Sequence, residues 1–437
     1  MPQNAKKKVV IITYYWPPSG GIGVMRSLKL SKYLTHYGWQ PIIFTASNAQ
    51  YPGIDRSNLK DISEDLEIIR QRIWEPYHLY KFLTGKKKTA NVNNVFYVQE
   101  EKNSWMHRLS VWIRSNFFIP DARRFWIRPA VRALVKYIQE NEVDAIISDA
   151  PPHSITRIGT LVKQRTGIPW IANFRDPWTQ IDYYQLLSLT KWGDARHKKM
   201  EQAAFQLADR ITIASPSWAE DLKAIGAKKV EPLPLGYDPD DYKDIPVKIA
   251  PDFLFTHLGI MGYDRNPSTF FEVLKALTQE KEDFAAHLKI RLVGQVDASV
   301  VQTYTQLGLE EQVENVGNVP RTEALELTMN SPILLLLLNQ QPNAKGRIPG
   351  KLFEYLAARR PILCLGPTDS DVAKIIAESK SGYTCAYEDA TGIKKVVQQL
   401  YQQFLDQNLQ SPLDSEIEAY QAPKLVKRFV EILEEIV

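Results

Sequence analysis

A short stretch near residue 350 places charged side chains where an anion could bind. Arg347, Lys351 and Glu354 lie around the start of a short helix that Pro349 is expected to open, because proline lacks the N–H that would be unbonded in a first turn. A helix N-terminus carries partial positive charge, so Arg347 and Lys351 oppose the helix dipole. A bound phosphate would resolve that conflict, and helix N-termini with nearby cations bind phosphates well.

A second interpretation is an ordinary surface ion pair between Lys351 and Glu354. The two residues are three apart on one helical face, and such a pair contributes about 0.2–0.5 kcal/mol, here in the less favourable order. If an anion binds instead, Lys351 faces it, and Glu354 lies one turn further on, where it could accept hydrogen bonds from sugar hydroxyls. These residues alone leave both interpretations open.

Two apolar runs, residues 332–338 and 361–365, flank this helix. The order of apolar run, short helix and apolar run predicts a βαβ unit whose strands are buried on both faces. A polar loop, residues 339–343, follows the first run and lies where open α/β sheets bind their ligands. The charged helix start is therefore expected beside a ligand crevice.

The rest of the chain repeats the alternation of strand and helix in two arrays. A length of 437 residues suggests two domains, and a hydrophobic fraction of 44% supplies two cores. We predict an α/β fold with two Rossmann-like domains that face a central cleft. The domains are placed at residues 1–240 and 250–412, with a Pro-rich linker between them and a last helix over 415–437 that packs back onto the first domain. Strands are expected at 8–13, 40–45, 143–148, 169–173, 210–214, 230–235, 253–258, 288–293, 313–317 and 382–386, as well as in the two apolar runs.

Two loops of the first domain follow predicted strands and hold candidate ligand groups. Closely spaced Gly20, Gly21 and Gly23 allow the backbone to approach a ligand, although a plain glycine-rich turn remains an alternative. His153 follows the strand at 143–148 and precedes a helix start. A histidine there could act as an acid or base or bind a substrate, or it could be a structural loop residue.

Several other classes of site are poorly supported. The first loop lacks the GxGxxG pattern, which argues against dinucleotide binding and makes a dehydrogenase the weakest interpretation. The histidines lack the spacing of metal ligands, so no metal site is expected. Cys364 and Cys385 lie in predicted buried strands and indicate a reduced compartment. No spanning helix or signal peptide is evident, so a cytoplasmic location is predicted.

The net charge of +4 conceals a basic region. Residues 70–136 contain fourteen Lys or Arg against four Asp or Glu, which points to nucleic acid, anionic lipid or a phosphorylated substrate. Within it, a helix from Trp105 carries an aromatic stripe beside basic residues, as in helices that lie in a membrane interface. A helix packed on its own domain fits the stripe equally well.

Separated motifs occur in one order over nearly the whole length: PPSGGIG at 17–23, EQAAFQLADRITIAS at 201–215, PLGYD at 234–238, GIMGYDRNP at 259–267 and PGKLFEYLAARRPI at 349–362. This combination resembles the GT-B glycosyltransferases, specifically the large retaining family 4 and its bacterial polysaccharide branch. The resemblance implies transfer of a sugar from a nucleotide-diphosphate-sugar donor, with retention, to a glycan or a polyprenyl-linked acceptor, and with no metal or other cofactor.

The resemblance also assigns roles. Glu354 would bind the nucleotide's ribose, and Lys351 and Arg265 would neutralise the diphosphate and stabilise the leaving group. Gly20 and Gly21 would let the first-domain loop approach the donor phosphate and sugar. His153 matches a cleft histidine, which makes it a catalytic candidate with Arg265 and Lys351.

One position departs from the family pattern. The family commonly places two glutamates eight positions apart, and the earlier position here is Gly346, so the glutamate that usually contacts the donor sugar is missing. A sugar-nucleotide epimerase and a non-catalytic, nucleotide-sugar-binding partner of a transferase are the alternatives. The resemblance leaves no role for nucleic acid, and it directs the basic region 70–136 toward an anionic membrane surface at the inner face of the cell membrane.

Overall fold

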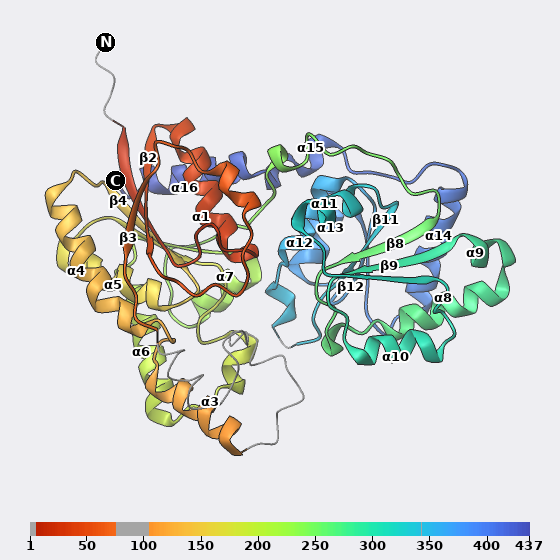
Figure 1. Cartoon of the computed structure of the whole chain (residues 1–437), viewed down its shortest axis with the longest axis horizontal. Helices are drawn as coiled ribbons and strands as arrows, with labels where there is room; N and C mark the ends of the chain where they lie inside the picture. Colours follow the sequence, from red (N-terminus) through yellow and green to blue (C-terminus); the bar gives the residue numbers. More distant parts are fainter. Residues whose placement is uncertain (1–5, 76–104, 342) are drawn as a thin grey trace, which may run out of the picture. The chain divides into compact units, whose positions relative to one another are not determined.

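The computed structural model describes residues 6–75, 105–341 and 343–437, which form two compact units (Figure 1). The first unit contains Met1–Leu233 and Leu425–Val437, and the second contains Pro234–Lys424. Each unit is built on one parallel sheet with helices on both faces. The α/β fold with two Rossmann-like units predicted from the sequence is confirmed. The chain changes unit after Leu233, whereas the sequence placed the boundary between 240 and 250.

The first unit holds a seven-stranded sheet in the order β3-β2-β1-β4-β5-β6-β7. Every neighbouring pair is parallel. The strands are β1 (Lys7–Thr13), β2 (Trp39–Ala46), β3 (Glu67–Gln71), β4 (Ala145–Ala150), β5 (Trp170–Phe174), β6 (Arg210–Ile213) and β7 (Val230–Pro232). Because β1 leads outward to β2 on one side while β4 continues on the other, the chain reverses direction between β1 and β4. In open α/β sheets ligands bind at the carboxyl ends of the strands beside such a reversal.

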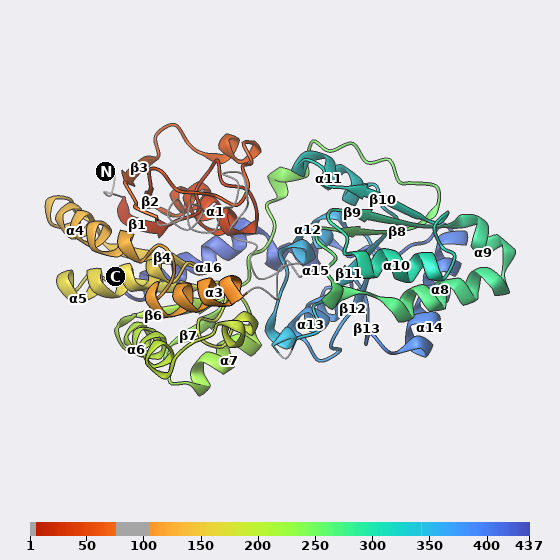
Figure 2. The same ribbon diagram turned by 60° about the horizontal axis from the view of Figure 1, so that its bottom comes forward.

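Helices cover both faces of this sheet. Figure 2 shows α4 and α5 on one face and α1 and α16 on the other. Alternate strand residues, such as Val10, Ile12 and Ile146, pack with Trp126 and Ile158 in one core. The helices of this unit are α1 (Met25–Tyr33), α3 (Trp105–Phe117), α4 (Arg124–Glu140), α5 (Ser154–Thr166), α6 (Lys191–Leu207), α7 (Pro216–Ala224) and α16 (Ala422–Glu434), whose residues from Leu425 belong to the first unit.

The second unit holds a six-stranded parallel sheet in the order β10-β9-β8-β11-β12-β13, so its chain reverses direction between β8 and β11. Its strands are β8 (Phe253–Leu258), β9 (Leu288–Val293), β10 (Val313–Gly317), β11 (Ile333–Leu337), β12 (Ile362–Leu365) and β13 (Gly382–Cys385). Its helices are α8 (Ser268–Glu280), α9 (Glu282–His287), α10 (Ala298–Gln306), α11 (Arg321–Met329), α12 (Gly350–Ala358), α13 (Asp371–Glu378), α14 (Ala390–Leu405) and α15 (Asp414–Ile417).

Strand β11 explains why its sequence is an unbroken apolar run. Ile333, Leu335 and Leu337 pack on one side with α8, α10 and α14, whereas Leu334 and Leu336 pack on the other with α11, α12 and α13. The prediction of a strand buried on both faces is confirmed. Pro349 was predicted to lie in the first turn of the next helix. It is instead the cap residue directly before that turn, and α12 begins at Gly350.

The structure corrects two expectations about elements. Strand β3 is absent from the set of strands predicted from the sequence. The last helix, expected over 415–437, is broken at Gln421, where Tyr237 N donates to Tyr420 O and Ala422 N donates to Tyr237 O.

Two smaller expectations concern cysteines and membrane spans. Both cysteines, Cys364 and Cys385, are buried and unpaired. Within the part of the chain that the structure describes, no helix combines the length and the apolar character that a membrane crossing requires.

Candidate functional site

Several charged side chains of the second unit lie at the carboxyl ends of β8 and β11, where the chain reverses direction. β8 runs directly into Gly259, whose φ of 100° is a conformation that favours glycine. The following 3-10 helix, η8 (Tyr263–Arg265), carries Arg265. After β11, a second loop leads through η9 (Ala344–Gly346) to α12. A hydrogen bond from Gln340 N to Asp264 O, 3.1 Å long, joins the two loops.

Tyr355 fixes α12 against the two central strands. Its hydroxyl accepts a hydrogen bond from Leu258 N at 2.8 Å and donates one to Leu335 O at 3.4 Å. The side chain is fully buried, and burial raises its pKa far above the usual range. The tyrosine therefore sets the position from which the first turn of α12 presents Lys351 and Glu354.

Lys351 reaches back over the end of β8. Its Nζ lies 3.3 Å from His257 Nε2, and a side chain at Gly259 would place its Cβ only 3.3 Å from the same Nζ. Burial and, to a smaller extent, Arg265 lower the pKa of Lys351 to about 7, and Glu354 opposes the shift. Near neutral pH this amine is therefore close to its own titration, and an anion beside it would favour the charged form.

Arg265 supplies a second positive charge at the same edge. Its Nη1 donates to Ile260 O at 3.2 Å. Its Nε is buried, and no hydrogen-bond partner exists for it among the residues that the structure describes. Buried polar groups are rarely left unsatisfied in native proteins, so this atom points to a ligand that supplies an acceptor.

Glu354 has an arginine, not Lys351, as its charged partner. Arg321 Nη1 lies 3.9 Å from Glu354 Oε1, and Arg321 Nη2 lies 3.3 Å from Asp241 Oδ2. Burial raises the pKa of Glu354, which Arg321 and Lys351 partly offset. In the described part of the chain no ion pair joins Lys351 to Glu354, so the surface-pair interpretation is wrong. Glu354 keeps acceptor capacity because the Arg321 contact is long.

Gly346 lies in the loop before α12. It is buried in η9 together with Ala344, and the next residue, Arg347, is half-buried in an extended conformation. Arg347, expected beside the anion, precedes the helix by three residues and is not among the groups that shift the pKa of Lys351. The sequence thus selected Lys351, Glu354 and Arg265 for one edge, and the structure brings these three together.

The first unit has a comparable edge between β1 and β4. Gly20 N donates to Gly53 O at 2.9 Å, which anchors the glycine loop to the segment before η3 (Ser57–Asp61). Gly21 is exposed, has a φ of 81°, and has no atom within 4 Å of the place a Cβ would take. Arg175 ties this loop to the next one, because it donates to Gly23 O and, at 2.8 Å, to Pro151 O.

His153 lies in the loop after β4 as the cap residue of α5. Its ring stacks on Trp178 with centroids 4.5 Å apart and planes 2° apart. The side chain is 8% exposed, and neither ring nitrogen has a hydrogen-bond partner among the described residues. Burial lowers the pKa of His153 to about 3, with smaller contributions from His197 and Arg175. His153 is therefore a neutral imidazole with two unsatisfied nitrogens.

Three residues of the second-unit edge were not selected from the sequence: His257, Arg321 and Asp241. His257 interrupts the apolar strand FLFTHL near its end, and this polar residue in a buried strand was the available signal. Arg321 and Asp241 lie in α11 and η7 (Pro239–Asp241), far from Glu354 in sequence, and nothing in their local pattern marks them.

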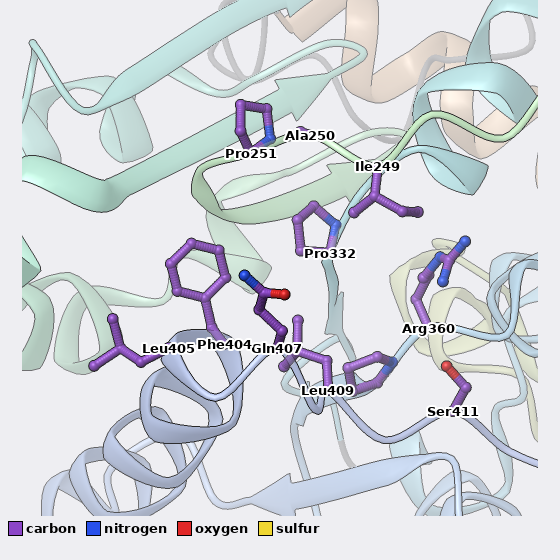
Figure 3. Close-up of a pocket in the computed structure, with 11 residues that line it drawn as sticks. Ile249, Ala250, Pro251, Pro332, Arg360, Phe404, Leu405, Gln407, Leu409 and Ser411 are labelled. Atoms are coloured by element: carbon purple, nitrogen blue, oxygen red, sulfur yellow. The ribbon is translucent and has the colours of Figure 1, made fainter.

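A separate cavity lies at the opposite edge of the same sheet. It has a volume of about 510 Å³ and is lined by Pro251, Pro332 and Pro361, each just before a strand, together with Phe404 and Arg360 (Figure 3). It lies at the amino ends of β8, β11 and β12, and none of the charged residues discussed above lines it. Its walls are mainly apolar, and we assign it no role in the site.

Solved structures of other proteins share this fold. Three solved structures align over nearly their whole length: HepE from Anabaena in complex with UDP (11% identity, 98% of this chain and 100% of that chain, TM-score 0.62), sucrose-phosphate synthase from Thermosynechococcus elongatus (12%, 98% and 98%, 0.62) and a TarM variant from S. aureus (12%, 98% and 99%, 0.59). At this identity the likeness establishes the fold, which is GT-B. The search of curated proteins found no match.

The sequence itself gives a second, independent match. Residues 91–241 match the family model described as Glycosyltransferase Family 4. The fold and this match agree with the resemblance stated from the motifs: the chain has the GT-B fold, and its residues 91–241 are similar to Glycosyltransferase Family 4. Part of the matched range lies outside the described residues.

Proposed function

We propose that this protein transfers a sugar, with retention at the anomeric carbon, from a nucleotide-diphosphate-sugar to a glycan or lipid-linked acceptor. The observation that carries the proposal is the convergence of Lys351, Arg265 and Glu354 at the carboxyl edge of β8 and β11. Two cationic groups beside a helix N-terminus suit a diphosphate, and a carboxylate one turn along the helix suits the two hydroxyls of a ribose.

The charged groups at this edge have separate roles in the proposed reaction. Lys351 and Arg265 neutralise the diphosphate and stabilise it as it leaves, because charge develops on the oxygen that separates from the anomeric carbon. The unsatisfied Nε of Arg265 gains an acceptor when the diphosphate binds. Glu354 accepts hydrogen bonds from the ribose, which replace part of its long contact with Arg321. No metal ion is expected to take part.

The first unit supplies the other half of the reaction in this proposal. Exposed Gly21 lets the loop after β1 approach the donor's sugar and phosphate. Neutral His153 hydrogen-bonds a sugar hydroxyl through one of its unsatisfied nitrogens. With its pKa near 3 it is a hydrogen-bonding group rather than a strong base. The acceptor hydroxyl forms the new bond on the face of the sugar from which the diphosphate departs, and the hydroxyl's proton passes to the departing diphosphate oxygen.

We also propose that the first unit approaches an anionic membrane surface. On α3, Leu109, Trp112, Ile113 and Phe117 are all exposed, while Asn116 anchors the helix by accepting from Thr190 N at 2.7 Å. Arg124 lies over the ring of Phe125, which packs against exposed Trp74. Aromatic side chains between arginines favour the boundary of an anionic bilayer. Such a surface would bring a polyprenyl-linked acceptor near the enzyme.

A donor screen tests the proposed function directly. The purified chain is heated with nucleotide-sugars of different base and sugar, and the donor that raises the melting temperature is then incubated with acceptors. We expect release of nucleoside diphosphate only when an acceptor is added. An isomerised donor without an acceptor would identify an epimerase instead, and binding without release for every acceptor tested would indicate a non-catalytic partner.

A further inference from the structure

His257 is a buried histidine in the central strand of the second sheet, and its contacts define its tautomer. The side chain is 1% exposed. Its Nδ1 lies 3.0 Å from Leu335 O, and because a carbonyl oxygen only accepts, Nδ1 must carry the hydrogen. In a neutral ring Nε2 then holds a lone pair, and this lone pair faces Lys351 Nζ at 3.3 Å. Lys351 is the donor in that contact.

The charged form of the ring does not fit this setting. When Lys351 is charged, a protonated His257 would present an N–H to an ammonium group, which has no acceptor. Burial lowers the pKa of His257 well below its usual value, and Lys351 and Arg265 also lower it, whereas hydrogen bonding to the backbone of Leu335 and Ile260 opposes the shift. The imidazole is therefore a fixed acceptor, held by the backbone of β11 and aimed at Lys351.

We propose that His257 is a positioning residue that holds the Lys351 amino group in place for the diphosphate, and that binding of the diphosphate takes up one proton on Lys351. This inference rests on the proposed donor site. It adds to that site a residue absent from the motifs and a pH dependence of donor capture. A neutral acceptor suits the task, because a carboxylate in its place would neutralise the charge that the diphosphate needs.

The groups around Lys351 set the proton balance. Arg265 faces it from η8, Glu354 from its own helix and His257 from β8; Arg321 from α11 and Asp241 from η7 stand behind Glu354. With a pKa near 7, the free amine is partly neutral at physiological pH. A diphosphate carries at least two negative charges and favours the ammonium strongly, so the bound state is protonated.

The sign of the pH dependence follows from this balance. Below pH 7 both free and bound Lys351 are charged, and the affinity for a nucleoside diphosphate changes little because of this residue. Above pH 7 the free amine must first gain a proton, so the affinity falls by up to tenfold for each pH unit. The fall ends where the bound amine itself loses its proton.

Calorimetric titration of the parent protein with UDP, repeated between pH 6 and 9 in two buffers of different ionisation enthalpy, measures this proton directly. UDP is the first probe, and GDP, ADP and dTDP follow if UDP does not bind. We expect uptake to approach one proton per site near pH 8 and to vanish near pH 6. Binding of normal strength without proton uptake at pH 8 would overturn the inference and leave the donor site standing. Failure of every nucleoside diphosphate to bind at any pH would overturn the proposed function itself.

Variants of His257 separate positioning from packing. His257→Leu removes the acceptor, so the midpoint of the pH profile should move about one unit lower and the affinity at pH 8 should fall roughly tenfold, the effect of one hydrogen bond to a charged group. His257→Gln should restore both, since an amide can donate to Leu335 O and accept from Lys351. A merely structural histidine would change the melting temperature and leave the midpoint in place, and that result would contradict the positioning role.

His287→Gln serves as the matched control. His287 belongs to the same unit, and its Nδ1 lies 3.0 Å from the Tyr401 hydroxyl, remote in the fold from Lys351. Its substitution should leave both the midpoint and the affinity unchanged. If His257→Leu does not fold, His257→Met replaces it: its flexible side chain fills the space but its thioether is only a weak acceptor, so the midpoint should again move lower.

Discussion

The position and the charge of Lys351 depend on neighbours from different parts of the chain. His257 from β8 accepts a hydrogen bond from it, Arg265 from η8 repels its charge, and Glu354 attracts it. The motif around residue 350 revealed Lys351 and Glu354, because both lie in one helical turn. It could not reveal His257, since contacts between a strand and a helix 94 residues apart depend on sheet order, which no local pattern encodes.

His153 and His197 make the first unit sensitive to acid. Burial lowers the pKa of His153 to about 3 and that of His197 to about 4, whereas an unfolded histidine titrates near 6.5. Protons therefore bind the unfolded chain more readily, and the stability present above pH 6.5 is lost as the pH falls toward these folded values. At pH 5 each histidine should reduce the free energy of unfolding by roughly 2 kcal/mol relative to pH 7.

Chemical unfolding at pH 7 and pH 5, followed by tryptophan fluorescence, measures this loss. His153→Gln should show a smaller difference between the two pH values than the parent. His36→Gln is the control, because His36 is exposed in the folded chain. A His153→Gln variant that loses as much stability between pH 7 and pH 5 as the parent would show that His153 is not held neutral by burial.

The turns that follow β8 and β9 pack closely against each other beside the site. Gly294 has a φ of 124°, and a Cβ there would lie 2.6 Å from Gly259 O. Gly294→Ala should therefore cost roughly 3 kcal/mol of unfolding free energy, from both strain and a backbone clash. Gly317→Ala should cost only about 1–2 kcal/mol, because its φ of 75° is strained for alanine but nothing lies within 4 Å of the added atom.

Thermal or denaturant unfolding of the two alanine variants checks the difference. Equal losses would mean that the close approach of Gly294 to Gly259 is relieved at no cost. A greater loss for Gly317→Ala would contradict the steric account of these turns.

Helix α3 tests the membrane proposal. Replacing Trp112 and Ile113 by serine removes two exposed apolar side chains, and we expect co-sedimentation with anionic vesicles at low salt to fall at least severalfold. Leu405→Ser is the control, since Leu405 is similarly exposed on the second unit. If the parent does not bind anionic vesicles at low salt, the membrane proposal fails.

Elements with strong periodicity were predictable, and those shaped by neighbours were not. The bounds of β8, β9 and β10 agree with the sequence prediction, because each strand ends at a glycine or directly before one. Strand β3 was missed because its sequence EIIRQ is short and only half-buried at the edge of the sheet. The last helix was expected to be continuous, yet pairing of Tyr420 and Ala422 with Tyr237 divides it.

At the level of the whole molecule, two sheets with the same kind of strand order define the fold. Each reverses direction at a central pair of strands, β1 with β4 and β8 with β11, and each carries its candidate ligand groups at that point. The alternation of strands and helices was sufficient to predict both Rossmann-like units. Which sugar is donated was not predictable, because its contacts depend on loops such as the one around Gly346, where the family pattern is not followed.

The stereochemistry of the product belongs to the whole molecule. We expect the anomeric configuration of the donor to be retained, as the family-4 match suggests, and turnover to continue in the presence of a chelator. NMR of the product's anomeric proton, recorded before any mutarotation, measures the first, and an assay with EDTA measures the second. An inverted product would contradict the proposed mechanism, and loss of activity in EDTA that Mg²⁺ restores would show that a metal ion is required.

The central claim is that the carboxyl edge of β8 and β11 binds the nucleotide diphosphate of the donor. Titration of a nucleoside and of its diphosphate into the parent, Lys351→Ala and Glu354→Ala tests it most directly, with Lys394→Ala as the control because Lys394 pairs with Glu280 on the surface. Lys351→Ala should weaken binding of the diphosphate roughly 10- to 100-fold and change binding of the nucleoside little. Glu354→Ala should weaken binding of both ligands by a similar factor. Parent-like binding of the diphosphate by both variants would contradict the claim.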